Sequence, residues 1–306
     1  MTTFKFLVEG LFPKEDIIIT KTNNTMVKPR FLEEEIIEPE FRWVNERRRI
    51  RGLPEAWPGP MCRLERWEVK NGKLYLTLGN TDYKDFIGLR SVGQDVIDLL
   101  GYEYFPNTLA VCSSVKTKDG KIILLRRSSQ NAEYPRWIHT YGGHPSVEKK
   151  DVYNGMQMEL IKERGIKPED IHEMVSTGMV MNYITKKPEV TFKTILKKTA
   201  SELEAIPCAE ERGEHELIAM EKGKKSYAMY IDNSPTELAS ALYRHDRIFV
   251  PPGQGALWRY GKLEFGDEWG KEVMYNLTQM WLKRSFDKTI RERDHSEDIT
   301  LEYGLI

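Results

Sequence analysis

Two glutamates carry the clearest chemical signal in this sequence. Glu159 and Glu163 are four residues apart in a segment expected to be helical, so their side chains share one face and lie one turn apart. Like charges at this spacing destabilise a helix slightly, and a divalent cation between them would remove the repulsion. Carboxylate oxygens are ligands that Mg²⁺ and Mn²⁺ prefer. Because the same spacing is common on solvated helices, the metal hypothesis depends on the neighbouring residues.

The residues around the pair favour a metal site over a solvated helix. Gly142 and Gly143 form a loop before the helix, where glycine allows a close backbone approach. Gly165 follows the helix and is expected to end it. Asp151 is interpreted as the N-cap rather than as a ligand, because at about 1.5 Å per residue it lies roughly 12 Å from Glu159.

Basic side chains near the loop could hold an anionic substrate. Arg126 and Arg127 end a strand that leads towards the glycines, and the planar arginine fork suits phosphate oxygens. Adjacent strand residues face opposite sides, so we expect only one to reach the site, unless both are surface arginines. His144 either contacts the ligand or shapes the loop. Lys162 contacts phosphate, reduces the number of metal ions, or silences the site.

Other candidates lie far from the helix in the sequence. The charged run 210–216 could supply a further carboxylate or a general base, although most charge runs are solvated loops. Tyr83 and Asp85 belong to an aromatic-rich turn. That turn either lines a cleft between two domains, where ligands often bind, or seals the interface between them.

Alternating strands and helices must position these residues. The Asn71-Gly72 turn between two alternating segments is a strong hairpin signal, and a second hairpin is expected to turn at 118–120. Apolar residues recur every four positions from Trp269 to Trp281, which indicates a helix packed on a core. This alternation predicts a mixed α/β sandwich. The predicted strands are 4–9, 16–20, 63–70, 73–79, 108–114, 121–126, one around 179, and 189–197, and the predicted helices are 40–51, 94–100 and 151–164.

The composition indicates a globular protein with a small-molecule ligand. Hydrophobic residues make up 40% of the 306, and the net charge of -1 provides no general attraction to nucleic acid or to an anionic membrane. The three cysteines, Cys62, Cys112 and Cys208, form no CxxC pair and are interpreted as thiols in a reducing compartment. No segment reads as a signal peptide or reaches the roughly 18 apolar residues of a membrane span, so we expect a cytoplasmic protein. The oligomeric state is left open.

The segment around the glutamates resembles the box of the Nudix superfamily. Aligned on Glu159 and Glu163, the closing glycine is Gly165 and the two aliphatic positions are Leu160 and Ile166. Four positions depart from the box: its first glutamate is Lys150, its arginine is Met158, the first of its two adjacent glutamates is Lys162, and its opening glycine is shifted by one, to Gly143. In the family the first glutamate and the arginine commonly pair, so the loss of both leaves no orphan charge.

Three motifs resemble a divergent Nudix branch that includes the animal UDP-glucose pyrophosphatase and its plant relatives. They are the segments 78–88, 125–128 and 142–145. The resemblance implies a Nudix α/β/α sandwich with a mixed sheet over residues 106–306, preceded by a smaller α+β domain over residues 1–105. It also implies metal-dependent hydrolysis of a nucleoside diphosphate linked to another moiety, above all a UDP-sugar such as UDP-glucose.

The same resemblance implies roles for single residues. Glu159, Glu163 and the backbone carbonyl of Gly143 would hold Mg²⁺ or Mn²⁺, and Glu163 and Glu216 would be the catalytic carboxylates. The substrate would be contacted by Arg126, Arg127, His144, Lys162, Tyr83 and Asp85. Two alternatives stay open. One is a catalytically silent Nudix module that binds a nucleotide or a protein partner, which Lys162 favours, and the other is a hydrolase of ADP-ribose or another dinucleotide.

Overall fold

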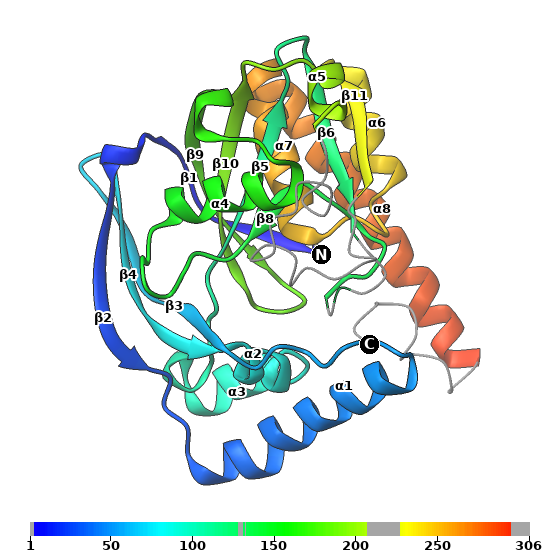
Figure 1. Cartoon of the computed structure of the whole chain (residues 1–306). Helices are drawn as coiled ribbons and strands as arrows, with labels where there is room; N and C mark the ends of the chain where they lie inside the picture. The colour runs from blue at the N-terminus through cyan, green and yellow to red at the C-terminus, as the bar shows by residue number, and fades with distance from the viewer. Residues whose placement is uncertain (1–2, 128–130, 132, 207–226, 295–306) are drawn as a thin grey trace.

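Two β-sheets form the framework of the molecule. The computed structural model describes residues 3–127, 131, 133–206 and 227–294. The larger sheet has the order β1-β9-β10-β5-β6-β11, with β7 paired to β6 and β8 to β5, and the smaller sheet has the order β2-β4-β3 (Figure 1). The strands are β1 (Phe4–Phe12), β2 (Ile17–Thr25), β3 (Pro60–Lys70), β4 (Lys73–Asp82), β5 (Ala110–Lys116), β6 (Lys121–Arg126), β7 (Ile138–His139), β8 (Tyr141–Gly143), β9 (Ile171–Asn182), β10 (Pro188–Leu196) and β11 (Tyr227–Asp232).

Helices cover both faces of the larger sheet and one end of the smaller sheet. They are α1 (Glu38–Ile50), α2 (Tyr83–Leu89), α3 (Gly93–Leu100), α4 (Val152–Arg164), α5 (Ala200–Glu204), α6 (Pro235–Arg244), α7 (Pro251–Phe265) and α8 (Asp267–Asp294). A π-helical segment, Leu32–Ile37, leads into α1. As predicted, Asp151 caps α4 by accepting a hydrogen bond from the backbone N–H of Asn154 at 3.0 Å. Gly165 ends α4 with φ 65°, the left-handed conformation that favours glycine.

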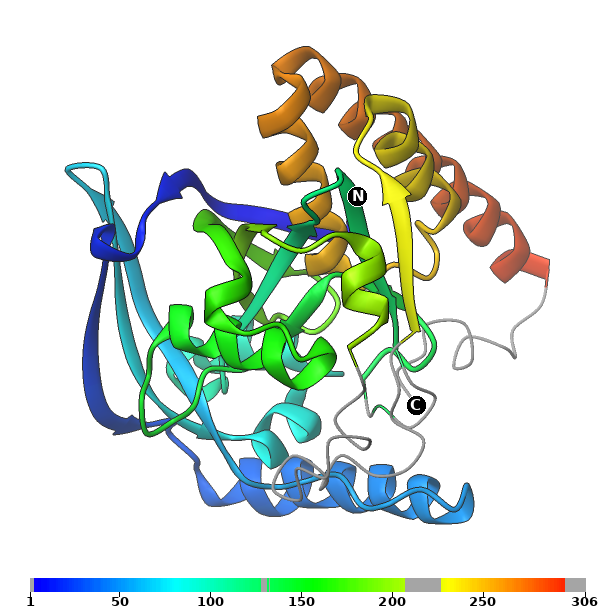
Figure 2. The same ribbon diagram turned by 45° about the horizontal axis from the view of Figure 1, so that its top comes forward.

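Alternate residues of β6 show how the larger sheet is sandwiched. Ile123 and Leu125 pack in one apolar cluster with Met156 of α4. Ile122 and Leu124 point the other way, into a cluster with residues of α6, α7 and α8. Figure 2 shows α6, α7 and α8 gathered on the face of the sheet opposite α4. The α/β/α sandwich with a mixed sheet is therefore confirmed.

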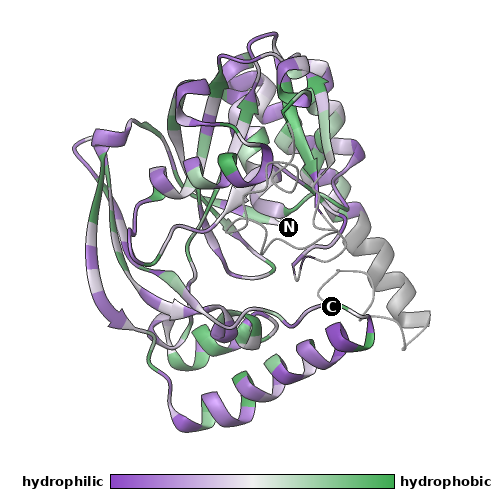
Figure 3. Ribbon diagram, in the orientation of Figure 1, coloured by the Kyte–Doolittle hydropathy of each residue, from purple (hydrophilic) through white to green (hydrophobic). Residues whose placement is uncertain are grey.

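The smaller sheet packs on the α4 side of the molecule. Leu74, Leu76 and Leu78 of β4 belong to the same buried cluster as Val111 of β5 and Met156 of α4. Figure 3 shows hydrophobic residues concentrated in β5 and β6, between the helix layers, whereas α1 is mostly hydrophilic. The three-stranded sheet and the sandwich thus share one core.

Locally encoded elements match the predictions. β3 and β4 pair antiparallel across Asn71 and Gly72, whose φ angles of 51° and 73° suit a tight hairpin turn. β5 and β6 form the second antiparallel pair. The four-residue stripe lies on α8, where Val273, Leu277 and Trp281 are buried. The aromatic-rich segment from Tyr83 was expected to be a turn and is instead the helix α2.

The first two strands lie in different sheets. β1 pairs antiparallel with β9, so the beginning of the chain is an edge strand of the larger sheet. β2 pairs in parallel with β4 of the smaller sheet. The division of the sequence at residue 106 therefore does not coincide with the division into sheets, because strand pairing follows spatial contact rather than order along the chain. A boundary between units that fold separately stays a prediction.

Two of the three cysteines can be placed. Cys62 and Cys112 are buried free thiols, as predicted, while Cys208 lies outside the described residues. Among the described residues, no helix has both the length and the apolar character needed to cross a membrane.

Candidate functional site

The two glutamates of α4 meet Gly142 and Gly143, which were expected to form a loop and instead end strand β8. A Cβ atom on Gly143 would lie 2.2 Å from Cδ of Glu159, so the carboxylate is packed directly against this backbone. A Cβ atom on Gly142 would lie 2.9 Å from Nε2 of His139. Both positions therefore need glycine for close approach, which was the reason given for the loop in the sequence.

The environment of the pair disfavours two negative charges. Burial raises the pKa of Glu159. Burial, followed by the neighbouring Glu159, raises the pKa of Glu163 well above its ordinary range. Backbone N–H groups of His144 and Gly142 oppose these rises for Glu159 and Glu163 respectively. Additional positive charge between the two carboxyl groups would stabilise their ionised forms.

A divalent cation fits these side chains. Oε2 of Glu163 is buried and has no hydrogen-bond partner, which leaves an oxygen lone pair available to a ligand. Within the described part of the chain, no group of three or more His, Cys, Asp or Glu side chains converges as a metal site. Two carboxylates with water and substrate oxygens are sufficient for Mg²⁺, so the predicted donor set of Glu159, Glu163 and the Gly143 carbonyl is chemically consistent. Glu216 lies outside the described residues.

Lys162 lies at the same carboxylates. Its Nζ is 3.0 Å from Oε1 of Glu159, and the exposed fractions of the two side chains are 34% and 12%. The lysine therefore places a positive charge on one of the two predicted metal ligands.

Only one of the two adjacent arginines is directed to the site. Arg126 is exposed, and its Nε donates to the carbonyl of Arg136 at 3.3 Å. Arg127 is half-buried, and its Nε donates to the carbonyl of Glu133 at 3.2 Å. Burial and Glu159 raise the pKa of Glu163 while Arg127 acts against them, so the guanidinium of Arg127 lies near that carboxyl. This is the alternation expected of neighbouring strand residues.

His144 follows the glycine loop as a neutral side chain. Burial, followed by the Lys187 ammonium, lowers the pKa of His144 to about 3, and Lys162 acts in the same direction. Nε2 of His144 is buried without a hydrogen-bond partner. The neutral ring thus has one nitrogen available to a ligand.

The two candidates on α2 have different surroundings. The hydroxyl of Tyr83 donates to Oε1 of Glu133 at 3.1 Å, which connects α2 to the segment between β6 and β7. Asp85 is buried and forms an ion pair with Lys28, whose Nζ is 3.2 Å from Oδ2. The charged neighbours of Asp85 are Lys28, Asp82 and Lys84. The structure therefore does not bring this residue to Glu159 and Glu163.

A buried group of charges beside His144 was missed by the sequence analysis. Nζ of Lys187 lies 2.8 Å from Oε2 of Glu133 and 3.9 Å from Oε1 of Glu189, and it is 5.2 Å from the ring centroid of Phe86. Burial disfavours the ionised form of Glu133, but the Lys187 ammonium acts against burial, and the pKa of Glu133 is lowered to about 2. Burial raises the pKa of Glu189 to about 7. Two charged residues flanking Pro188, at the start of β10, were the available signal.

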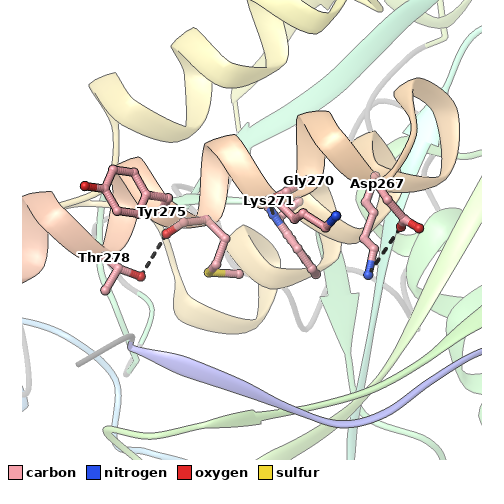
Figure 4. Close-up of a pocket in the computed structure, with 8 residues that line it drawn as sticks. Asp267, Gly270, Lys271, Tyr275 and Thr278 are labelled. Atoms are coloured by element: carbon pink, nitrogen blue, oxygen red, sulfur yellow. Dashed lines mark hydrogen bonds and ion pairs between the residues drawn. The ribbon is translucent and has the colours of Figure 1, made fainter.

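A groove of about 520 Å³ lies elsewhere, between α7 and α8 (Figure 4). Trp258, Lys262 and Tyr275 are among its lining residues, and Nζ of Lys262 is 3.7 Å from Oδ1 of Asp267 at one end. None of the predicted site residues lines this groove. Its chemistry is therefore unrelated to the carboxylate pair.

The chain is similar to a known protein over part of its length. The human uridine diphosphate glucose pyrophosphatase NUDT22 is 32% identical to this chain over 115 residues, which are 33% of this chain and 37% of the human protein. This match confirms the predicted resemblance to a Nudix protein. The chain matches little more than a third of that relative's length. No family model matches the chain.

Solved structures give weaker likenesses. DR0079 from Deinococcus radiodurans has a TM-score of 0.34 and 11% identity, over 50% of this chain and 82% of that one. The MutT protein from Methanosarcina mazei Go1 has a TM-score of 0.33 and 15% identity, over 51% of this chain and 94% of that one. Neither likeness is close enough to support an argument about function.

Proposed function

We propose that this protein is a metal-dependent hydrolase that cleaves a nucleoside diphosphate linked to another moiety. The observation that carries the proposal is the half-buried carboxylate of Glu159 against the Gly143 backbone, together with the buried, unpartnered Oε2 of Glu163 one turn further along α4. Such a pair is costly without a cation, and a divalent ion would offset the cost. The similarity to a Nudix protein supports the same reaction class.

The proposed substrate is a UDP-sugar such as UDP-glucose. The human relative is named as a uridine diphosphate glucose pyrophosphatase, and it matches this chain over part of its length. Hydrolysis of the diphosphate would give a nucleoside monophosphate and a sugar phosphate. ADP-ribose or another dinucleotide is the alternative substrate of the same reaction.

Each side chain has a task in this proposal. Glu159 and Glu163, with the carbonyl of Gly143, would hold Mg²⁺ or Mn²⁺, and such an ion polarises phosphate oxygens and lowers the pKa of bound water. Arg127 would orient the diphosphate through its fork, while His144 would donate or accept one hydrogen bond through Nε2. Tyr83 is held by Glu133 and would shape the edge of the site. Arg126, Asp85 and Glu216 have no task supported by the described contacts.

A hydrolysis screen with product identification tests the proposal. The full chain with Mg²⁺ or Mn²⁺ is expected to cleave UDP-glucose or another nucleotide sugar. Glu163→Gln keeps the side-chain shape but removes a ligand charge, and it is expected to reduce the rate by about a thousandfold. The matched control is Glu272→Gln, an exposed glutamate on α8. Undiminished activity in Glu163→Gln would place the metal on other residues.

One observation favours a second function, a silent module that binds a nucleotide or a protein partner. The ammonium of Lys162 already neutralises Glu159, so the site has lost part of its demand for a metal ion. A silent module would show no turnover in the screen but clear thermal stabilisation by one of the nucleotides. Turnover in the unmodified protein would eliminate this alternative.

A further inference from the structure

Lys162 and a divalent ion require the same carboxylate. Nζ of Lys162 lies 3.0 Å from Oε1 of Glu159, while Oε2 of Glu163 on the next turn of α4 has no partner. A doubly charged ion and an ammonium group about 4 Å apart on one carboxylate repel strongly. In this arrangement one predicted metal ligand is paired with an internal cation, and the other has one oxygen without a partner.

The ion pair of Lys162 with Glu159 can be broken without disturbing the fold. The Lys162 side chain is 34% exposed and extends from α4 on a flexible four-carbon stem, so it can turn without moving the helix. Glu159 is fixed more firmly, because it is 12% exposed and lies against Gly143. In the described part of the chain, no other carboxylate lies within ion-pair distance of Lys162. A part-exposed ion pair of this kind contributes little to stability, so a stronger ligand can displace it.

We propose that Lys162 is an internal competitor for the divalent ion at Glu159 and that it transfers to the substrate's phosphate when the ion binds. The inference rests on the proposed function, because it assumes a metal ion and a diphosphate at this site. Binding of the metal ion and binding of the phosphate are then coupled through Lys162. The metal ion displaces the lysine from Glu159, and a phosphate that binds the lysine leaves Glu159 available to the metal ion. Each ligand therefore raises the affinity of the other by the same factor.

The coupling can be measured without turnover. Mn²⁺ binding to the full chain is titrated by electron paramagnetic resonance, alone and with methylenediphosphonate, a diphosphate analogue that cannot be hydrolysed. The free Mn²⁺ concentration is corrected for the complex that the diphosphonate forms in solution. The unmodified protein is compared with Lys162→Met, which keeps most of the stem and removes the charge.

The expected result has two linked parts. In Lys162→Met, Mn²⁺ alone binds about fivefold more tightly, since no ion pair has to be broken. The gain in Mn²⁺ affinity on adding methylenediphosphonate falls by about the same factor, because no lysine remains to be transferred. Lys121→Met is the matched control, since it removes an exposed ion pair with Asp232 at the opposite end of β6 from Arg127, and it should change neither quantity.

Three outcomes would overturn the inference, and they differ in what else they affect. If Lys162→Met tightens Mn²⁺ binding but leaves the coupling unchanged, Lys162 contributes only background charge. If neither quantity changes while Mn²⁺ binds, the ion binds without involving Glu159. If no protein binds Mn²⁺, with or without the diphosphonate, the proposed metal-dependent function fails together with the inference. Circular dichroism of each variant establishes that it is folded.

Discussion

Two buried carboxyl groups beside the same lysine have pKa shifts of opposite sign. Lys187 lies between Glu133 and Glu189, but its Nζ is 2.8 Å from the first carboxylate and 3.9 Å from the second. The closer carboxyl is held ionised, with its pKa lowered to about 2, whereas burial dominates at the farther one and raises its pKa to about 7. Two differences explain this: Lys187 donates a hydrogen bond to Glu133, and the negative charge of Glu133 adds to the effect of burial at Glu189.

The raised pKa of Glu189 predicts a stability change with pH. Its value in the folded protein, about 7, exceeds the ordinary value of 4.5, so the neutral carboxyl stabilises the folded state below about pH 4.5. That contribution is lost as the pH rises through 7, which corresponds to roughly 3 kcal/mol in total. Glu189→Gln stays neutral at every pH. Its free energy of unfolding, relative to that of the unmodified protein, should therefore increase as the pH is raised from 5 to 8. Urea unfolding of both proteins at pH 5 and at pH 8 measures this change. The same difference in free energy between the two proteins at both pH values would contradict the prediction.

The pair Glu133 and Lys187 predicts a large cost for removing one partner. Lys187→Met leaves a buried ionised carboxylate without its cation, and we expect a loss of about 3–5 kcal/mol in the free energy of unfolding. The double variant Glu133→Gln, Lys187→Met should recover much of this loss, since no buried charge remains. Denaturant unfolding of both single variants and the double variant gives the coupling. A double variant no more stable than Lys187→Met would assign the cost to packing against Phe86.

At the scale of elements, the contact between β8 and α4 requires glycine at position 143, where a side chain would collide with Glu159. Gly143→Ala would place Cβ 2.2 Å from Cδ of Glu159, so the carboxylate must move while the helix can stay in place. We expect a Mn²⁺ affinity lower by about tenfold or more, with little change in stability. Ser146→Ala, in the same loop, is the control. Unchanged Mn²⁺ binding in Gly143→Ala would show that Glu159 is not a metal ligand.

The sequence predicted elements whose signals are local. The Asn71-Gly72 hairpin, the Asp151 cap and the Gly165 stop are each determined within a few residues, and the structure confirms them. The helix α2 was missed because its aromatic residues do not show a helical stripe over only seven positions.

In the candidate site, too, the residues with local sequence signals could be predicted and those brought together by packing could not. Glu159, Glu163 and the glycine loop could be identified from spacing along the chain. The ion pair of Glu133 with Lys187 joins residues 54 positions apart, and the burial that perturbs both depends on packing that periodicity does not reveal. The roles of the predicted site residues stay predictions.

At the scale of the whole molecule, the two sheets and α4 share contacts across the predicted boundary. Leu74, Leu76 and Leu78 of the smaller sheet share a core with α4, and β1 completes the larger sheet. The N–H of Leu64 also donates to the carbonyl of Asn107 at 2.9 Å, across the predicted boundary. A cut at residue 106 would expose the edge of β9 and one side of the shared core.

This arrangement predicts that the two parts do not fold apart. The full chain should unfold in a single cooperative urea transition, and a fragment of residues 106–306 should lack one. Joining residues 1–13 to that fragment through a Gly/Ser linker should restore part of the cooperativity, since it supplies β1. A fragment that unfolds cooperatively without β1, or two resolved transitions in the full chain, would establish the boundary near residue 106.

The pairing of β1 with β9 also has a consequence for the order of events on the ribosome. β1 ends at Phe12, whereas its partner begins at Ile171, so β1 is synthesised long before the strand with which it pairs. At typical elongation rates this interval is on the order of ten to thirty seconds. During that time an apolar strand beginning at Phe4 is available to chaperones or to other nascent chains, and closing it over so long a loop is slow.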